Sequence, residues 1–465
     1  MITASRTPAA VSAEAVPRSR AAVGLTRRGL LLFLAGALFL APAFFMPRMA
    51  WGMAVWDAAI LLVALLDAWR LPAPGKITAE RVWKTAPSLG NETEIEIGLT
   101  QEGDMQLRCM VTDDLTPAFT EAPCMLPMKL YPTGRSKAGY RFMPRERGDH
   151  TTGRLYLRYR SVSLGLAERW AFADVRQQVR VYPSVRPNRE QSFFLTRSKQ
   201  IELQKRLLRQ RGLGRDFESL REYREGDDLR DLCWTATARR GVPITRQYQT
   251  EKSQPVWLLM DAGRLMQARV ATADRKEEYT RLDYATATAL ALTQLALGSG
   301  DRVGLLAYGQ NVQQRVPLGR GASQMRQLME SLAQVRGESG EADHLNATLV
   351  LNRLQPRRSL ILWITDVAET SMRPEVIDGA AYLMRRHLLL FVAMRQTEML
   401  SLAGLRPENR QEMFAVAAAQ ELVHRRMVLM AQLREQGALT METEPRNLTA
   451  AVLNRYLEVK EQALL

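Results

Sequence analysis

Cysteine and histidine are scarce in this chain of 465 residues, which has three cysteines and four histidines. The cysteines, Cys109, Cys124 and Cys233, are too few and too scattered for a disulfide framework, and they form no C-x-x-C pair. Four histidines leave little for a zinc site. The composition therefore argues against disulfide-rich and zinc-binding folds and favours a reducing compartment.

The chain also lacks a glycine-rich phosphate loop. "GRGAS" at 319–323 has no Walker lysine, and "LGSGD" at 297–301 lies at the end of a predicted helix. No Ser/His/Asp set is recognisable in the middle of the chain, where His150 follows Asp149 in a predicted turn. We therefore predict a protein that is not an enzyme and needs no nucleotide of its own.

Acidic residues are outnumbered: 64 Lys and Arg against 49 Asp and Glu give a net charge of +15. Such a balance suits nucleic acid or anionic lipid. The sequence carries no RNA-recognition, zinc-finger or basic-zipper signature, so no nucleic-acid partner is expected. A basic nucleic-acid binder at the membrane remains an alternative that depends on net charge alone.

Two apolar runs stand near the amino terminus. Residues 1–26, rich in Ala, Ser, Arg and Pro, predict a disordered tail. Gly29 to Met46 and then "AWGMAVWDAAILLVALLDAW" predict a transmembrane helical hairpin over 27–70, with Trp51, Trp56 and Trp69 at membrane interfaces. The alternative is a cleaved signal peptide followed by an exported body.

Basic residues flank this hairpin on its outer sides. Arg27 and Arg28 precede the first run and Arg70 follows the second, whereas only Arg48 lies between the runs. The positive-inside rule then places both termini in the cytoplasm. We expect a bacterial inner-membrane protein with two spans that contacts lipid through its hairpin.

Residues 75–184 alternate apolar and polar positions in short runs such as "TEIEIGL" and "GRLYLRYRS", separated by turn formers. This pattern predicts a small antiparallel β-sandwich. Residues 185–254 then hold a cationic, predicted helical linker (196–212), which is a solvated face or a surface for anionic lipid. The linker leads into the densest polar cluster of the chain.

That cluster, "GRDFESLREYREGDDLRDLCWTATARRG", alternates acids and bases around apolar anchors that include Leu220, Leu229 and Trp234. Asp227 and Asp228 either accept hydrogen bonds from neighbouring arginines or act as cation ligands or a general base. "DLCWTATARRG" predicts a helix whose positive end lies near Asp231.

The same segment resembles the bacterial domain-of-unknown-function family number 58. The family hallmark R-x-Y-x-x-G-D-x-x-R-x-x-x-W-x-x-x-A-R matches a set of eight positions: Arg221, Tyr223, Gly226, Asp227, Arg230, Trp234, Ala238 and Arg239. With the neighbouring Asp228, these positions apart from Ala238 are the predicted partner-binding residues. The resemblance implies a von Willebrand factor A-like domain and partnership with a MoxR-type AAA+ ATPase that assembles or matures other proteins.

Residues 255–465 alternate buried strands, such as "VWLLMDA" and "SLILWITDV", with amphipathic helices. This order predicts an α/β fold, a doubly wound parallel sheet of the von Willebrand A type with C-terminal helices. Sites are expected at the carboxyl ends of its strands.

A von Willebrand A metal site resembles D-x-S-x-S after the first strand, a middle-loop Thr and an Asp after the fourth strand. Asp261 and Asp366 stand where the acids stand, whereas Gly263 and Leu265 replace both serines. Ala342 takes the Thr position, with Ser339 and Thr348 as alternatives. We therefore expect a degenerate site with no cofactor, or at most weak Mg²⁺ binding. A second hypothesis is that Arg264 supplies a guanidinium in place of the metal.

The sequence is compatible with two functions besides nucleic-acid binding. The favoured one is a membrane-anchored adaptor or scaffold that faces the cytoplasm, binds clients and works with a MoxR-type ATPase. The alternative is a metal-dependent hydrolase that uses Asp227, Asp228, Asp261 and Asp366, and it requires these acids to converge in one cleft.

Overall fold

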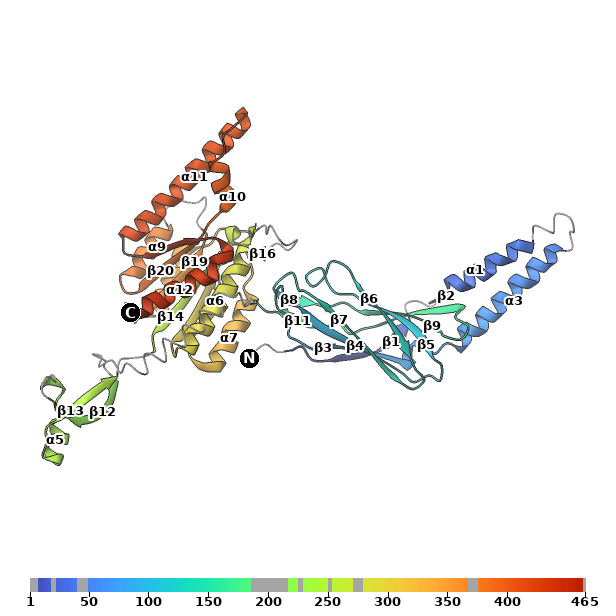
Figure 1. The fold of residues 1–465 in the computed structure, drawn as a ribbon, viewed down its shortest axis with the longest axis horizontal. Coiled ribbons are helices and arrows are strands. Elements are labelled where there is room, and N and C mark those ends of the chain that lie inside the picture. The colour runs from blue at the N-terminus through green and yellow to red at the C-terminus, as the bar shows by residue number, and fades with distance from the viewer. Residues whose placement is uncertain are drawn as a thin grey trace. The chain divides into compact units, whose positions relative to one another are not determined.

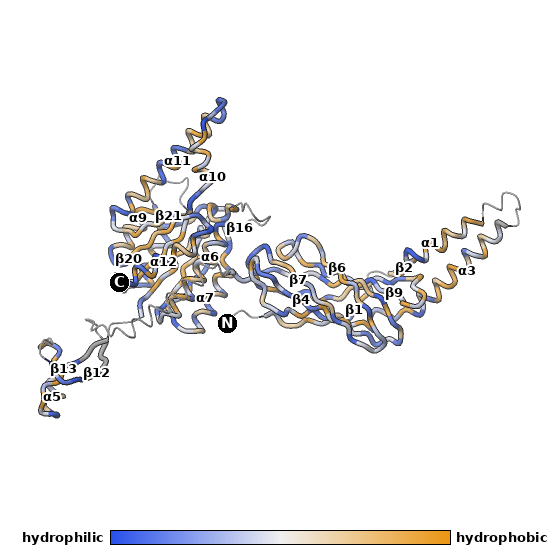
Figure 2. The backbone as a smooth tube through the Cα atoms, in the orientation of Figure 1, coloured by the Kyte–Doolittle hydropathy of each residue, from blue (hydrophilic) through white to orange (hydrophobic). Residues whose placement is uncertain are grey.

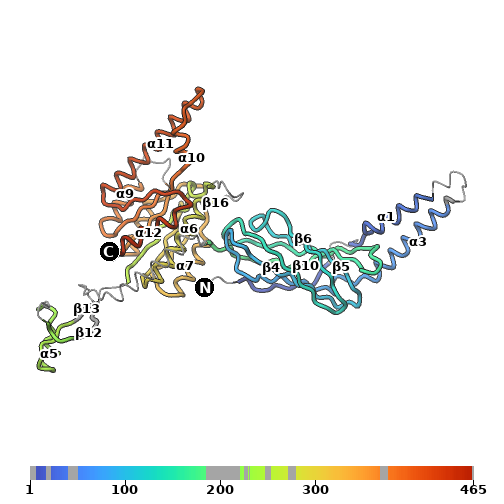
Figure 3. The backbone as a smooth tube through the Cα atoms, viewed as in Figure 1, coloured from blue at the N-terminus to red at the C-terminus, as the bar shows by residue number. Residues whose placement is uncertain are grey.

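A computed structural model describes residues 7–17, 22–39, 49–184, 216–224, 229–249, 253–270, 279–366 and 375–462. The predicted linker helix (196–212) lies outside these residues. The chain divides into two compact units, Met1–Ser184 and Val185–Leu465, which are described separately (Figures 1 and 3).

The first unit is built of antiparallel strands that alternate buried and partly exposed residues, as Ile77–Trp83 does throughout its length. Because side chains alternate along a strand, this period of two puts one row of side chains in the interior. The strand order is β6-β5-β9-β10-β1-β3-β4-β7, with β2 beside β10 and β8 paired with β11. The strands are β1 (Val11–Pro17), β2 (Val23–Leu25), β3 (Ile77–Trp83), β4 (Thr93–Gln101), β5 (Leu107–Asp113), β6 (Cys124–Leu130), β7 (Arg135–Phe142), β8 (Gly148–Thr151), β9 (Leu155–Ser161), β10 (Ala167–Ala173) and β11 (Gln178–Val181).

Strand β1 corrects the expectation of a disordered tail over residues 1–26. Its first half, 11–14, pairs with β3, and its second half, 15–17, pairs with β10, so β1 joins two groups of strands. Residues 23–25 form β2. The prediction was wrong for these stretches because their partners lie 60 or more residues further along the chain, where local composition gives no indication of them.

Two apolar helical segments belong to this unit: α1 (Arg27–Ala35), continued by the 3₁₀ turn η1 (Gly36–Phe39), and α3 (Met49–Arg70). Among the described residues, one helix, Trp51–Arg70, is long and apolar enough to cross a membrane. Residues 40–48, which hold the end of the first predicted span (40–46) and part of the predicted turn, lie outside the described residues. The indole of Trp56 donates a hydrogen bond of 2.8 Å to the Leu32 carbonyl, and this bond joins α3 to α1.

A buried joint attaches both helices to the strands. The Asp67 carboxylate, 1% exposed near the end of α3, accepts hydrogen bonds from the backbone N–H groups of Leu166 (2.8 Å) and Ala167 (3.0 Å). Thr26, which caps α1, donates its N–H to the Leu166 carbonyl at 2.8 Å. At Gly29 a Cβ atom would lie 2.7 Å from that same carbonyl oxygen, so the close approach of α1 requires glycine.

The second unit contains a six-stranded sheet with strand order β18-β17-β14-β19-β20-β21. β14 pairs in parallel with β17 and β19, as do β19 with β20 and β20 with β21, whereas β18 is an antiparallel edge strand. The central strands are apolar and buried along nearly their whole length, as expected for a parallel sheet covered on both faces. The predicted α/β class is confirmed. The strands are β14 (Pro255–Asp261), β17 (Arg302–Tyr308), β18 (Val312–Gly319), β19 (Leu360–Thr365), β20 (Leu388–Met394) and β21 (Leu439–Thr443).

Helices cover this sheet (Figure 1). On one face, α8, α9 and α11 pack against Trp257, Trp363 and Phe391 of the sheet to form one apolar core. On the other face α6 contacts β14 and β17, and α12 and α7 pack beside α6. The short helix α10 runs along the first part of α11 (Figure 1). The helices are α6 (Arg281–Gly298), α7 (Gly321–Gln334), α8 (His344–Leu354), α9 (Glu375–Met384), α10 (Thr397–Ala403), α11 (Arg410–Glu435) and α12 (Leu448–Glu461).

Candidate functional site

Asp261 and Asp366 lie at the same edge of the sheet. Asp261 is the last residue of β14, and Asp366 directly follows β19, the parallel neighbour of β14. The two residues are 3% and 2% exposed. The structure thus places both predicted acids at adjacent strand ends, in the interior, where each carboxylate needs partners.

Asp261 finds its partners on the strand ends themselves. The Thr365 hydroxyl donates to Oδ2 at 2.6 Å, and the Gly263 N–H donates to Oδ1 at 2.7 Å. Burial raises the pKa of the Asp261 carboxyl, while these two hydrogen bonds stabilise its charged form and oppose the rise. Both carboxylate oxygens therefore accept hydrogen bonds from the protein.

Asp366 is held by two arginines. Arg281 forms an ion pair with its Oδ2 through Nη1, and Arg426 donates from Nη1 to Oδ1 at 2.9 Å. Gln396 donates from Nε2 to Oδ2 at 2.9 Å. Arg426 also donates from Nε to the Glu442 carboxylate at 2.8 Å. Two guanidinium groups and two carboxylates thus form a buried cluster with no formal net charge, named here the Asp366 cluster (Arg281, Asp366, Arg426 and Glu442).

Arg281 is placed by the start of α6. Thr280 caps this helix in a reciprocal capping box with Asp283, so Arg281 is its first residue. Burial lowers the pKa values of both Arg281 and Arg426. Arg264, the residue that the sequence hypothesis named, is exposed, whereas the guanidinium groups beside Asp366 belong to Arg281 and Arg426.

The positions expected for metal-binding hydroxyls are closed by backbone and methyl groups. A Cβ atom at Gly263 would lie 2.9 Å from both Cβ and N of Ala342. The Arg264 N–H donates to the Gly340 carbonyl at 2.9 Å, which holds the two loops together. Ser339 is exposed, and the Thr348 hydroxyl donates within α8 to the Leu345 carbonyl at 2.8 Å. The hydroxyl of Thr348 is thus engaged within its own helix.

These donors do not fit Mg²⁺, which requires several oxygen ligands in octahedral geometry. One carboxylate is neutralised by arginines and the other is hydrogen-bonded on both oxygens. Within the described part of the chain, no group of three or more His, Cys, Asp or Glu side chains is suited to a metal ion.

A chain of aromatic hydrogen bonds that the sequence did not reveal lies beside Asp261. The Trp363 indole donates to the Tyr308 hydroxyl at 2.7 Å, and this hydroxyl lies 2.9 Å from Nδ1 of His344. Burial, followed by the charge of Asp261, raises the pKa of Tyr308 well above its ordinary value. These side chains come from β19, β17 and α8, so only the folded sheet brings them together.

The family signature segment forms a small module. β12 (Asp216–Glu222) pairs antiparallel with β13 (Ile244–Gln249), and η3 (Leu229–Asp231) and α5 (Trp234–Arg240) lie between them. The predicted helix therefore begins at Trp234, and Asp231 lies in a 3₁₀ turn before it. Gly226, Asp227 and Asp228, together with the side chain of Arg230, lie outside the described residues.

The described signature residues are largely at the surface of this module. The Tyr223 N–H donates to the Pro243 carbonyl at 2.9 Å, and Arg221 donates to the Glu222 carbonyl at 3.1 Å. Arg239 and Ala238 are exposed. The predicted apolar anchors Leu229 and Trp234 are 68% and 71% exposed, so within this module they do not act as core residues.

The chain thus carries an α/β domain with a parallel sheet and two buried acids at its carboxyl edge. Residues 219–428 match the family model described as "Protein of unknown function DUF58". An uncharacterized protein of Mycobacterium tuberculosis (strain H37Rv) is 28% identical over 157 residues, which cover 33% of this chain and 48% of that protein. An uncharacterized protein of Mycobacterium bovis matches to the same extent. The chain spans about half the length of the curated relatives it matches.

Two solved structures share a weak likeness. The conserved hypothetical protein BatB from Bacteroides thetaiotaomicron is 12% identical, with a TM-score of 0.29 over 45% of this chain and 100% of that chain. The vWF domain of the type V pili tip protein Mfa5 from Porphyromonas gingivalis is 9% identical, with a TM-score of 0.30 over 46% and 97%. The match to the family model confirms the predicted family resemblance for residues 219–428, whereas the MoxR partnership and the membrane anchor stay predictions.

Proposed function

We propose that this protein is a membrane-anchored adaptor whose cytoplasmic α/β domain binds other proteins without a metal ion. It would work with a MoxR-type AAA+ ATPase in the assembly or maturation of client proteins. The observation that carries the proposal is the Asp366 cluster, in which guanidinium groups neutralise the carboxylate at the sheet edge. If the doubly wound sheet is of the von Willebrand A type, Asp261 and Asp366 form its degenerate metal site, and Arg281 and Arg426 take the place of the metal ion.

Helix α3 supports the membrane anchor. Trp51 and Trp69 are 75% and 84% exposed and stand 18 residues apart. At 1.5 Å per residue that separation is about 27 Å, close to the thickness of a bilayer's hydrocarbon core. Arg27, Arg28 and Arg70 lie at the helix ends that meet the strands, which favours a cytoplasmic position for the first unit. We propose two spans in the bacterial inner membrane with both termini in the cytoplasm.

The hydrolase alternative is weaker on the same observations. It needs Asp261 and Asp366 to bind a metal or activate water, yet Asp366 is occupied by Arg281 and Arg426. Its other two acids, Asp227 and Asp228, lie outside the described residues. The alternative of a basic nucleic-acid binder gains no specific support from the described contacts.

Co-purification from membranes tests the adaptor proposal. When the tagged chain is extracted in mild detergent, it is expected to retain a MoxR-type ATPase from the same cells. In a separate experiment, alkaline washing of the membranes without detergent is expected to leave the chain in the membrane pellet. A chain that leaves the pellet, or that retains no such ATPase under mild detergent, would contradict the anchor or the partnership respectively.

A further inference from the structure

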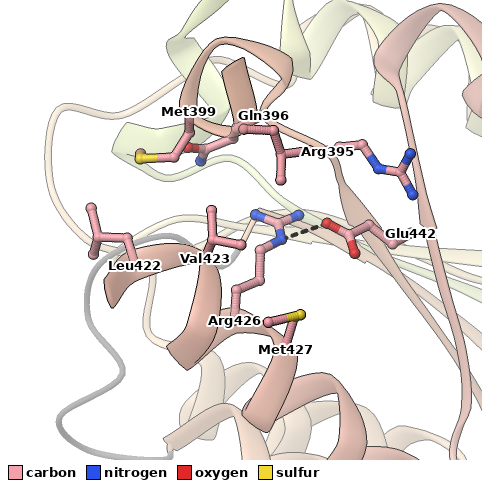
Figure 4. A pocket seen from close by; sticks show the side chains of 9 residues that line it. Arg395, Gln396, Met399, Leu422, Val423, Arg426, Met427 and Glu442 are labelled. Atoms are coloured by element: carbon pink, nitrogen blue, oxygen red, sulfur yellow. Dashed lines mark hydrogen bonds and ion pairs between the residues drawn. The ribbon is translucent and has the colours of Figure 1, made fainter. Parts of the chain in front are cut away.

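A cavity of about 310 Å³ lies between α10 and α11, at the carboxyl ends of β20 and β21. Its apolar walls come from Met399 and Leu400 of α10 and from Leu422, Val423 and Met427 of α11 (Figure 4). Pockets for small ligands span about 300–1,000 Å³, so this one has room for one or two side chains rather than a large cofactor.

The floor of the cavity is polar and already satisfied. Arg426 donates to Glu442 at 2.8 Å, to Asp366 at 2.9 Å and to the Met394 carbonyl, so all three of its nitrogens are engaged. Figure 4 shows the Arg426–Glu442 pair between the two helices. The floor therefore orients its neighbours and offers no free cation to a ligand.

Arg395 supplies a surplus positive charge at this cavity. It lines the cavity and is exposed, and its guanidinium has no ion-pair partner among the described residues. Among the residues that line the cavity, Arg426 and Glu442 pair with each other, which leaves one positive charge on Arg395, whose side chain extends away from the apolar walls in Figure 4. Charge complementarity thus calls for an anionic group on whatever binds.

The apolar walls are unusually open to solvent. Leu400 is 41% exposed and Met427 is 58% exposed, and Met413 and Phe414 of α11 are 52% and 61% exposed. Figure 2 shows hydrophobic and hydrophilic stretches alternating along α11. Methionine side chains adapt to varied partners, which suits them to a surface that receives a peptide.

We propose that this cavity binds an acidic amphipathic segment of a partner protein. A large apolar side chain of the segment enters between Met399 and Met427, and a neighbouring carboxylate pairs with Arg395. This inference rests on the proposed function as a protein-interaction domain and places the contact at the ends of β20 and β21. Gln396, which lines the cavity and donates to Asp366, links an occupant to the Asp366 cluster.

Fluorescence anisotropy with the purified full-length chain in detergent tests this site. The probe is a short fluorescein-labelled helical peptide with leucines along one face and glutamates beside them. Two matched peptides carry lysine in place of glutamate or alanine in place of leucine. The glutamate–leucine peptide is expected to bind about ten-fold more tightly than either, because a rim charge and a filled apolar pocket both contribute.

Two variants at exposed positions locate the binding. Arg395→Glu is expected to weaken the acidic peptide about ten-fold and to favour the lysine peptide instead, whereas Met427→Asp weakens both. Arg410→Glu, an exposed arginine on α11 outside the cavity, makes the same change in net charge and should alter affinity less than about two-fold. Unchanged thermal unfolding of the three variants confirms that each one folds.

Several outcomes overturn the proposal. Equal binding of the lysine peptide, equal binding of the alanine peptide, or an Arg410→Glu loss as large as that of Arg395→Glu would mean that the net charge of +15 attracts the probe non-specifically. The two proposals can also fail separately. If the peptide binds but no ATPase co-purifies, only the ATPase partnership is contradicted. If an ATPase co-purifies with the Arg395→Glu and Met427→Asp variants and the peptide does not bind, only the proposed pocket is contradicted.

Discussion

Replacing Arg281 by methionine tests whether a guanidinium holds the sheet edge in place of a metal. Asp366 is 2% exposed, and the change removes one of its two ion-pair partners, which leaves the Asp366 cluster with a net charge of −1. Removing one partner of a buried pair costs about 3–5 kcal/mol. Because Asp366 keeps Arg426 and Gln396, both at 2.9 Å, we expect the lower end, about 3 kcal/mol.

The measurement is thermal unfolding of the full-length chain, followed by near-ultraviolet circular dichroism of the buried Trp257 and Trp363. For a domain of about 150–250 residues, 3 kcal/mol corresponds to a fall in Tm of about 6–12 °C. A matched control is Arg264→Met, which removes an exposed arginine and should change stability by less than about 0.5 kcal/mol.

A double-mutant cycle separates the ion pair from simple loss of packing. In Arg281→Met/Asp366→Asn the remaining Arg426–Glu442 pair is neutral, so the double variant should be more stable than the sum of the single losses predicts. The reasoning is refuted if Arg281→Met melts with the wild type, or if the two losses simply add.

Three further predictions follow from the described contacts. Isothermal calorimetry should detect no tight Mg²⁺ binding to the wild type. Gly263→Ser should not create such binding, because a Cβ atom at this position would lie 2.9 Å from Ala342. Tight Mg²⁺ binding by either protein would contradict the closed site. Asp67→Ala should destabilise the first unit by about 2–4 kcal/mol in thermal unfolding, because two backbone N–H groups lose their acceptor. Asp67→Asn should lose less stability. Equal melting of the wild type and both variants would contradict the role of Asp67 in attaching α3 to the strands. Burial lowers the pKa of His387 from 6.5 to about 4, so between these pH values this side chain is protonated in the unfolded chain and neutral in the folded chain. The free energy of unfolding should therefore fall by up to about 3 kcal/mol between pH 6.5 and 4, and urea titrations should show a flatter pH dependence for His387→Gln.

Local pattern was enough to predict much of the second unit. "VWLLMDA" and "SLILWITDV" are continuous apolar runs that end in an acid, and they form the neighbouring strands β14 and β19 with Asp261 and Asp366 at one edge. This succeeded because a buried parallel strand is defined by its own residues, and because carboxyl ends of parallel strands meet at one edge.

The ion-pair partners of Asp366 could not be predicted from the local sequence pattern. Arg281 and Arg426 lie 85 and 60 residues from Asp366, one at the start of the largely buried helix α6 and the other in α11, and no local pattern marks either as a partner of that acid. Strand β1 escaped prediction for a related reason, since its small residues match a disordered tail until β3 and β10 supply hydrogen bonds. Both features depend on contacts made only after folding.

Under the proposed function, the replacement of a metal ion by arginine beside Asp366 decides where the carboxylate of a partner can bind. A metal ion held by two carboxylates keeps open coordination positions, and a partner's carboxylate can occupy one of them. Arg426 has no such position, since its Nε, Nη1 and Nη2 already donate to Glu442, Asp366 and Met394. An acid that approaches this edge of the sheet must therefore pair with another cation. Under the proposed function, a partner's acid therefore pairs with Arg395, the arginine at the cavity between α10 and α11 that has no ion pair among the described residues.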